Sequence, residues 1–201
     1  MLDARLRPLI DTPLNAMGRG IARAGMSANG VTMVGMMLGI GAGFSIAHNA
    51  FWWGLALVLA NRLLDGLDGA VARASGQTDF GGYLDIVADF VFYIAVPVGF
   101  GFAAVHNQFP ALVLVASFTL TGISFLAFAT IAAKRGAETS DHGQKSFFYS
   151  TGIAEGAETI VAFVVMCLWP EHFPFIAFAY SAICVLTVLQ RSMLARATFR
   201  D

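Results

Sequence analysis

Charged residues are scarce in this sequence. Only 12% of its 201 residues are charged, whereas a soluble globular domain carries about 25%. Hydrophobic residues make up 57%, and the mean hydropathy is +0.70. The apolar runs are longer than the roughly 4–8 residues of a buried strand. We therefore expect an all-α integral membrane protein, and because no low-complexity linker or repeat divides the chain, a single domain over residues 1–201.

The sequence also lacks any large net charge and any cysteine framework. Its net charge of −1 gives no reason to expect a nucleic acid as partner. The two cysteines, Cys167 and Cys184, both lie in apolar runs. We expect small buried core residues there, not a disulfide or a metal-binding pair.

The N-terminal segment lacks the continuous apolar stretch of a signal peptide. Its apolar residues instead recur on one helical face, at Leu14, Met17 and Ile21. Arg19 and Arg23 lie one helical turn apart beside them. The pattern predicts an amphipathic helix over residues 1–26 that lies on the membrane surface and binds membrane lipid.

Six apolar segments follow the N-terminal helix. Each is long enough to cross a bilayer as a helix of about 20 residues. We predict a bundle of six transmembrane helices over residues 28–195, with spans at 28–48, 51–75, 80–105, 110–133, 146–169 and 173–195.

Basic residues are absent from one set of the predicted loops. All twelve lysines and arginines border the other membrane face, and none lies near residues 48–49, 106–108 or 170–174. By the positive-inside rule, both termini and the polar helix ends are cytoplasmic, as in a multi-pass protein of a bacterial inner membrane. Trp52, Trp53 and Trp169 lie at the opposite interface, where indole rings prefer to be.

The segment from Asn61 to Asp89 is the one place where acidic residues gather in the apolar part of the chain. Asp65 and Asp68 are spaced i, i+3, so they share a helical face, and Asp85 and Asp89 are spaced i, i+4. Between them, Gly76 interrupts the helical pattern, and Thr78 or Asp79 can cap the next helix. The spacing predicts an antiparallel helical hairpin in which four carboxylates converge near one membrane face.

Such a cluster is unfavourable without cations. Each carboxylate near hydrocarbon costs about 2.5–3.5 kcal/mol on insertion scales, and Arg62 and Arg73 can neutralise at most two of the four. An all-oxygen site suits Mg²⁺ or Mn²⁺, and four glycines leave room for a phosphate ligand: Gly66, Gly69, Gly81 and Gly82. The alternatives are inter-helix salt bridges, or a metal-coupled transporter, which more often holds its ions near the bilayer midplane.

Written out, the segment reads Asp65-x2-Asp68-Gly69-x2-Ala72-Arg73-x7-Gly81-x3-Asp85-x3-Asp89. It resembles the signature of the CDP-alcohol phosphatidyltransferase family at all eight fixed positions. Six spans and a preceding amphipathic helix also match that family. The resemblance implies transfer of a phosphatidyl group from a CDP-linked lipid, such as CDP-diacylglycerol, to a small alcohol during phospholipid biosynthesis, with release of CMP.

The resemblance also implies a role for each matched residue. Asp65, Asp68 and Asp85 would bind two divalent metals that bridge the donor pyrophosphate. Asp89 would count with them as a metal-binding residue, next to a metal, and would act as the general base for the acceptor hydroxyl. Gly69, Ala72 and Gly81 would make room for the cytidine diphosphate, while Arg73 offsets phosphate charge. Together with Gly35, Gly39 and Gly43, which line one face of the first span, the resemblance also favours a homodimer.

Further candidates lie outside this motif. Asn29 and Thr32 resemble an element before the first helix of the family, so they either line the nucleotide pocket or only cap the helix. Glu155 and Glu158, which we expect a few turns inside the fifth span, could bind the acceptor or pair with Arg62. Three basic residues at the same membrane face could bind an acceptor phosphate or only set the topology: Lys134, Arg135 and Lys145.

The acceptor stays open at this point. The basic residues favour a polyol phosphate such as glycerol 3-phosphate, whereas the two glutamates favour inositol, serine or an amino alcohol. A divalent-cation transporter and a membrane prenyltransferase are the alternatives from other classes. A prenyltransferase would normally show two separated acid-rich motifs, and a transporter would need polar groups along a full path, which the fourth and sixth spans lack.

Overall fold

The computed structural model describes residues 2–135 and 152–199, and within these ranges the chain is helical and contains no strand. The predicted all-α class is therefore confirmed for the described residues. The elements in order are α1 (Leu2–Arg23), α2 (Ala28–Ala47), α3 (Phe51–Ser75), α4 (Asp79–Ala103), the 3-10 turn η1 (Val105–Asn107), α5 (Gln108–Lys134), α6 (Gly156–Leu168), the 3-10 turn η2 (Pro170–His172) and α7 (Phe173–Thr198).

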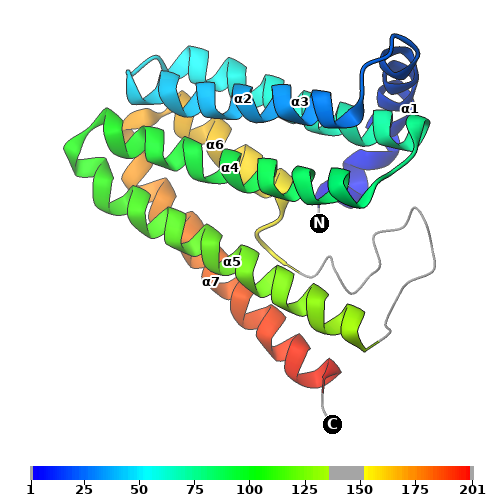
Figure 1. The fold of residues 1–201 in the computed structure, drawn as a ribbon. Coiled ribbons are helices and arrows are strands. Elements are labelled where there is room, and N and C mark those ends of the chain that lie inside the picture. The colour runs from blue at the N-terminus through cyan, green and yellow to red at the C-terminus, as the bar shows by residue number, and fades with distance from the viewer. Residues whose placement is uncertain (1, 136–151, 200–201) are drawn as a thin grey trace.

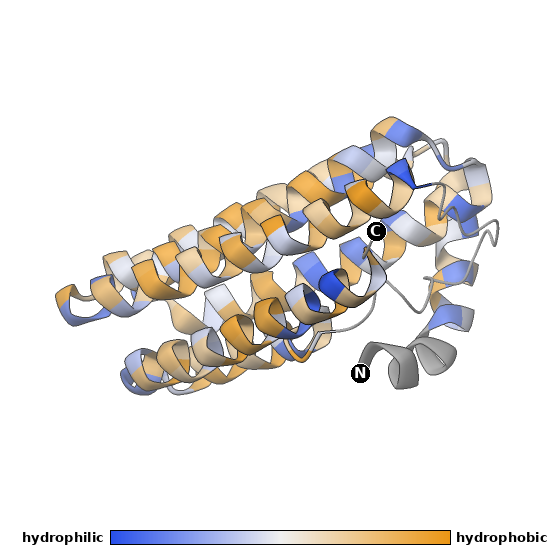
Figure 2. Cartoon of the chain, turned by 90° about the horizontal axis from the view of Figure 1, so that it is seen from below, coloured by the Kyte–Doolittle hydropathy of each residue, from blue (hydrophilic) through white to orange (hydrophobic). Residues whose placement is uncertain are grey.

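The helices form two groups that α4 joins (Figure 1). In the first group α2 packs against both α3 and α4, and α1 crosses α3 near its C-terminal end. In the second group α5 and α7 run side by side, and α5 also contacts α4. α6 packs against α3. Apolar residues dominate the long helices (Figure 2), as expected for helices that face lipid.

Among the described residues, four helical segments are long and apolar enough to cross a membrane. They are α2, α4, the η1–α5 segment Val105–Lys134 and the η2–α7 segment Pro170–Thr198. α3 has 25 residues, but its second half is polar, and α6 has only 13 residues. Length and hydropathy therefore identify only four of the six predicted spans as membrane-crossing helices in the described residues. The count of six stays a prediction.

The predicted fifth span, 146–169, is wrong at its start. Its first residues lie outside the described part of the chain, and α6 begins only at Gly156. Residues 152–155 are not helical, because the backbone N–H groups of Ile153 and Ala154 both donate to Oγ1 of Thr187 on α7, at 3.2 and 2.9 Å. The hydroxyl of a neighbouring helix thus accepts hydrogen bonds from two backbone N–H groups that would bond to backbone carbonyl oxygens in a longer helix.

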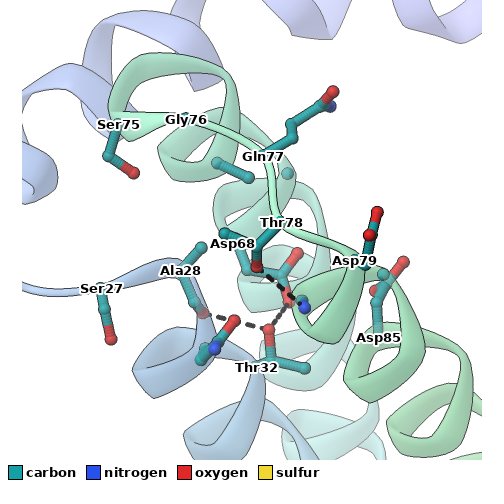
Figure 3. A pocket seen from close by; sticks show the side chains of 15 residues that line it. Ser27, Ala28, Thr32, Asp68, Ser75, Gly76, Gln77, Thr78, Asp79 and Asp85 are labelled. Carbon is teal, nitrogen blue, oxygen red and sulfur yellow. Dashed lines mark hydrogen bonds between the residues drawn. The ribbon is translucent and has the colours of Figure 1, made fainter.

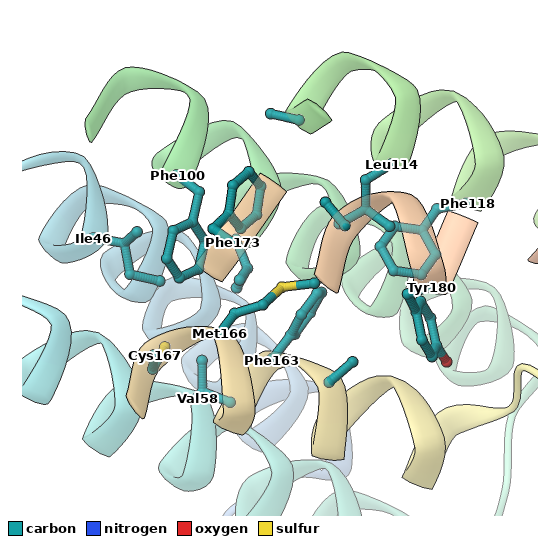
Figure 4. Packing of buried hydrophobic residues seen from close by; sticks show 14 of the residues in the cluster. Ile46, Val58, Phe100, Leu114, Phe118, Phe163, Met166, Cys167, Phe173 and Tyr180 are labelled. Atoms are coloured by element: carbon teal, nitrogen blue, oxygen red, sulfur yellow. The ribbon is translucent and has the colours of Figure 1, made fainter. Parts of the chain in front are cut away.

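The core combines aromatic rings with aliphatic and small side chains (Figure 4). Phe100 of α4 stacks on Phe173 of α7 with ring centroids 4.4 Å apart, and Phe163 of α6 lies edge-on to Phe118 of α5. These contacts connect the two helix groups at the end away from the acidic segment. Cys167 and Cys184 are buried free thiols, as predicted.

Small residues bring α1 onto the polar half of α3. A Cβ atom added at Gly18 would lie 2.6 Å from Cβ of Ala70, and one added at Gly66 would lie 3.0 Å from Leu14. Leu14 and Ile21 pack against a small buried cluster that contains Leu67. The apolar stripe predicted for this helix therefore packs partly against α3, and the placement of α1 on a membrane surface stays a prediction.

Candidate functional site

The α3–α4 hairpin positions the acidic residues. α3 ends before Gly76, whose φ of 104° belongs to the left-handed region that glycine adopts freely. Thr78 then caps α4, because its Oγ1 accepts a hydrogen bond from the backbone N–H of Gly81 at 3.0 Å. The predicted antiparallel hairpin is confirmed, with Thr78 as the capping residue, so the end of α3 faces the start of α4.

Three of the four aspartates form a compact group. Each of Asp65, Asp68 and Asp85 offers a carboxylate oxygen, and these oxygens lie within 4.8 Å of one another. Asp68 is buried, Asp65 is partly buried and Asp85 is exposed, so the group opens to one side. Hard oxygen donors at this separation fit a Mg²⁺ or Mn²⁺ ion, which the three residues could share.

Thr32 orients the buried member of this group. Its Oγ1 lies 2.6 Å from Oδ2 of Asp68 and 3.0 Å from the carbonyl oxygen of Ala28, so its single proton can serve one of them at a time. The shorter contact joins α2 to α3 at the floor of the site. Thr32 was predicted as a nucleotide-pocket residue or a plain cap; Ser27 is the residue that caps α2.

Asp89 lies outside the compact group and contacts Arg62 instead. One terminal nitrogen of Arg62 donates to Oδ1 of Asp89 at 3.0 Å, and the other lies 3.5 Å from Oδ2 of Asp65. Nε of Arg62 donates to Oδ1 of Asn61 at 2.9 Å. The fourth aspartate therefore lies outside the compact group and shares Arg62 with Asp65, although it lies one turn from Asp85.

A cavity of about 740 Å³ lies beside the acidic group (Figure 3). Its walls come from the start of α2, the end of α3, the α3–α4 turn and the start of α4; they include Asn29, Thr32, Asp68, Gly69, Ala72, Gly81 and Asp85. The structure thus brings together around one cavity five of the six residues predicted to bind cytidine diphosphate. The bare backbone at Gly81 matters, because a Cβ atom there would lie 3.2 Å from Oδ1 of Asn29.

Arg73, the sixth of these residues, contacts α1. Its Nε and one terminal nitrogen donate to Oδ1 of Asn15 at 3.1 and 2.9 Å. Its other terminal nitrogen would lie 3.4 Å from a Cβ atom added at Gly69, at the edge of the cavity. The contact to donor phosphate stays a prediction for this residue.

The residues predicted to bind the acceptor lie on other elements. Lys134 is in the last turn of α5, and Arg135, just after it, donates to the carbonyl oxygen of Phe199 at 3.1 Å. Glu158 is in the first turn of α6, but Glu155 is the residue before that helix and not a few turns inside a span, because α6 starts later than predicted. Lys145 lies outside the described residues.

Two buried polar residues were not predicted to lie in the interior. Asn61 is buried, and its Nδ2 donates to the carbonyl oxygen of Gly35 at 2.7 Å. Arg191 was counted only as a topology-setting charge, yet it is buried and donates to the carbonyl oxygen of Thr121 and to Oγ of Ser124. A polar residue in a helix that borders the apolar part of the chain was the available signal in both cases.

Comparison with known proteins gives a family and a fold. Residues 26–190 match the family described as CDP-alcohol phosphatidyltransferase. The inner membrane protein YnjF of Escherichia coli K12 is 43% identical over 192 residues, which cover 95% of this chain and 93% of that protein. The archaetidylinositol phosphate synthase of Pyrococcus horikoshii is 34% identical over 88 residues, which cover 43% of this chain and 46% of that enzyme.

Solved structures show the same arrangement of helices. The Mycobacterium tuberculosis phosphatidylinositol phosphate synthase PgsA1 with CDP-DAG bound superposes with a TM-score of 0.72 over 91% of this chain and 93% of that chain, at 21% identity. The same enzyme in complex with manganese and citrate gives a TM-score of 0.65 over 90% and 88% of the two chains, at 22% identity. The fold is thus shared, and the match over residues 26–190 establishes that this chain belongs to the CDP-alcohol phosphatidyltransferase family.

Proposed function

We propose that this protein transfers a phosphatidyl group from a CDP-linked lipid such as CDP-diacylglycerol to a polyol phosphate, with release of CMP. The observation that carries the proposal is the group of three carboxylates, two of which line a cavity with the glycines of the same motif. Family membership supports the reaction class. The structural neighbour solved with CDP-DAG bound supports the type of donor.

The residues divide the chemistry between them. Asp65, Asp68 and Asp85 would hold Mg²⁺ or Mn²⁺, with two ions expected, and the neighbour solved with manganese supports this choice of metal. When bound, the metal orients the pyrophosphate and offsets charge on the leaving CMP. Gly69, whose missing side chain opens the cavity wall, leaves space for the nucleotide.

Asp89 is proposed as the base. It takes the proton of the acceptor hydroxyl while that oxygen forms a bond to the lipid-bearing phosphorus. The bond from this phosphorus to the bridging pyrophosphate oxygen breaks, its electron pair stays on that oxygen, and CMP leaves. A position beside the metal ligands, yet outside their compact group, suits a residue that faces the acceptor.

A phosphorylated acceptor is favoured by three basic residues of the sequence. Lys134, Arg135 and Lys145 are the proposed phosphate contacts, and Glu155 and Glu158 the proposed hydroxyl contacts. Glycerol 3-phosphate and an inositol phosphate both have this chemistry. Two relatives of the chain are named as inositol-phosphate-lipid synthases, which makes the inositol phosphate the second candidate.

We further propose the membrane arrangement that the sequence predicts. Six helices cross the bilayer, α1 lies at the interface, and both termini and the cavity face the cytoplasm. The separation of the basic helix ends from Trp52 and Trp53 at the other end of α3 supports this orientation.

Acceptor-dependent release of CMP tests the function. The full-length protein in lipid nanodiscs receives CDP-diacylglycerol, Mn²⁺ and one acceptor at a time: glycerol 3-phosphate, inositol 1-phosphate, inositol or serine. We expect CMP release with a phosphorylated polyol, and release about 10²–10⁴-fold slower with the Asp89→Asn variant. Release only with serine or free inositol would contradict the acceptor class. Donor binding without CMP release for any acceptor would contradict the transferase reaction with small alcohols.

A further inference from the structure

Arg62 lies between the compact carboxylate group and Asp89, at the junction of three helices. It belongs to α3, one turn before Asp65, and only 17% of its side chain is exposed. Its two terminal nitrogens contact carboxylates from different helices, Asp65 of α3 and Asp89 of α4. The eight fixed positions of the family motif do not include this residue.

The guanidinium group is fixed from several directions. Nε donates to the side chain of Asn61, whose Nδ2 in turn donates to the carbonyl oxygen of Gly35 on α2 at 2.7 Å. The guanidinium carbon lies 4.5 Å from the ring centre of Phe92, and that ring is fully buried. Since both the amide and the ring are held by the core, Arg62 has little freedom to follow a moving carboxylate.

A fixed guanidinium restricts the carboxylate that it binds. Its hydrogen bond of 3.0 Å goes to Oδ1 of Asp89, so the second oxygen of this carboxylate lies outside that contact. Asp89 is also the aspartate that the compact group leaves out. The only other cation of the acidic segment, Arg73, contacts Asn15 of α1 in this structure.

We propose that Arg62 is a positioning residue for the reaction proposed above: it holds Asp89 away from the metal-binding carboxylates and directs the second carboxylate oxygen to the acceptor hydroxyl. The inference rests on the proposed function, because it gives Asp89 the role of the base. It goes beyond that function because it names a side chain outside the family motif as the group that sets the position and orientation of the base.

The side-chain type fits this task. Arginine presents a planar fork of donors that can hold two carboxylates and lie flat on an aromatic ring, whereas lysine offers a single flexible ammonium. The alternative is that Arg62 only ties α3 to α4 in the fold. The two roles differ in a measurable way, because a positioning residue acts through Asp89 and loses its effect when Asp89 is removed.

Turnover of single and double variants separates these roles. The full-length protein in nanodiscs is prepared as wild type, Arg62→Met, Arg62→Lys, Asp89→Asn and the Arg62→Met/Asp89→Asn double variant. Arg196→Met, in the last turn of α7, is the control for removal of a basic charge. For each, kcat and KM for the acceptor are measured, together with binding of Mn²⁺ and of CDP-diacylglycerol.

We expect Arg62→Met to lower kcat about 100-fold, the size of effect that a misplaced reacting group produces. KM and both binding constants should change less than about threefold, and Arg62→Lys should recover part of kcat. In the Asp89→Asn background, Arg62→Met should add less than about threefold, because coupled residues are not additive. Arg196→Met should behave as wild type.

Independent effects of the two substitutions would overturn the inference, and so would loss of Mn²⁺ or donor binding as large as the loss of kcat. If Arg62→Met does not fold, the Arg62→Lys variant tests the inference. A wild-type kcat in Arg62→Lys would contradict a role for the planar fork of arginine. Absence of CMP release from the wild type would overturn the proposed function and this inference together. Normal wild-type turnover with an additive double variant would overturn the inference alone.

Discussion

At the scale of single residues, the four aspartates of the motif have two different environments. Asp65, Asp68 and Asp85 bring one oxygen each within 4.8 Å of the others, while Asp89 lies outside this group and accepts a hydrogen bond from Arg62. Asp68 is further ordered by the hydroxyl of Thr32. Identical side chains on two adjacent helices are therefore expected to respond differently to the same substitution.

Substitution of Asp89 and Asp68 by asparagine tests this difference. Asp89→Asn should lower turnover by about 10²–10⁴-fold, the contribution of a general base, and should leave binding of the CDP-lipid largely intact. Asp68→Asn should impair donor binding itself, because it removes a ligand of the metal that holds the pyrophosphate. A CDP-lipid binding isotherm and an initial rate for each variant provide the measurement.

A different result would change the role of Asp89. If Asp89→Asn loses donor binding as severely as Asp68→Asn, with no separate effect on turnover, then Asp89 is a fourth metal ligand and not the base. The position of Arg62 would then serve to balance charge, and its coupling to Asp89 would appear in metal affinity.

At the scale of helices, close contact between α2 and α4 holds the two sides of the site together. Gly43 of α2 lies against the backbone of Ala95, and Gly99 lies against Gly43 itself. Gly39 leaves space for the ring of Phe92, on which Arg62 rests. The glycine face of the first span therefore packs within the chain, which removes it as an argument for a dimer.

A methyl group at Gly43 tests the tightness of this contact. The added Cβ atom would collide with the backbone of Ala95, so Gly43→Ala should lower the free energy of unfolding by about 1–3 kcal/mol, as overpacked cores do. Gly41 is a matched control on the same helix, because its Cβ atom would lie 3.6 Å from Leu57, an ordinary contact distance. Thermal unfolding in mild detergent measures both variants.

The control should be neutral, or stabilising by up to about 1 kcal/mol, because alanine is the better helix former. Equal stability of Gly43→Ala and Gly41→Ala would show that α2 and α4 separate easily. In that case the contact does not hold Thr32 and Asp85 at their observed positions.

At the scale of the whole molecule, the acidic cluster makes activity depend on divalent metal. Aspartates alone would repel a pyrophosphate, so we expect turnover to disappear in excess EDTA and to return when Mg²⁺ or Mn²⁺ is added. Asp65→Asn and Asp85→Asn should each weaken metal binding as well as turnover. The measurements are CMP release and Mn²⁺ titration; full turnover in the chelator would refute the metal role.

The oligomeric state is a second property of the whole molecule. We predict a homodimer in the membrane, on the resemblance to the family, with the interface on faces other than the glycine face of α2. Native mass measurement in nanodiscs or mild detergent should show twice the chain mass of 21.4 kDa. Monomers at every protein concentration would contradict the prediction, while CMP release by such monomers would show that one chain suffices for the reaction.

Much of the site could be predicted because the residues that form it lie close together in the sequence. The spacing of Asp65, Asp68, Asp85 and Asp89 and the interruption at Gly76 lie within one helical hairpin, so helical periodicity alone brings the carboxylates together. The family resemblance, confirmed by the match over residues 26–190, added the chemistry. The start of the fifth span was wrong for the opposite reason, since Thr187 of α7, which is far away in the sequence, satisfies the backbone that precedes α6.

The sequence by itself thus determined the helical class, the apolar character of the chain and the hairpin that carries the acids, because composition and short-range periodicity suffice for each. Only the tertiary structure decided how the charges are paired. Arg62 bridges Asp65 and Asp89, and Arg73 contacts Asn15 on α1. Neither pairing follows from spacing, since a long flexible cation can reach several carboxylates. The packing of α1 against α3, and of α3 and α4 against α2, selects one partner.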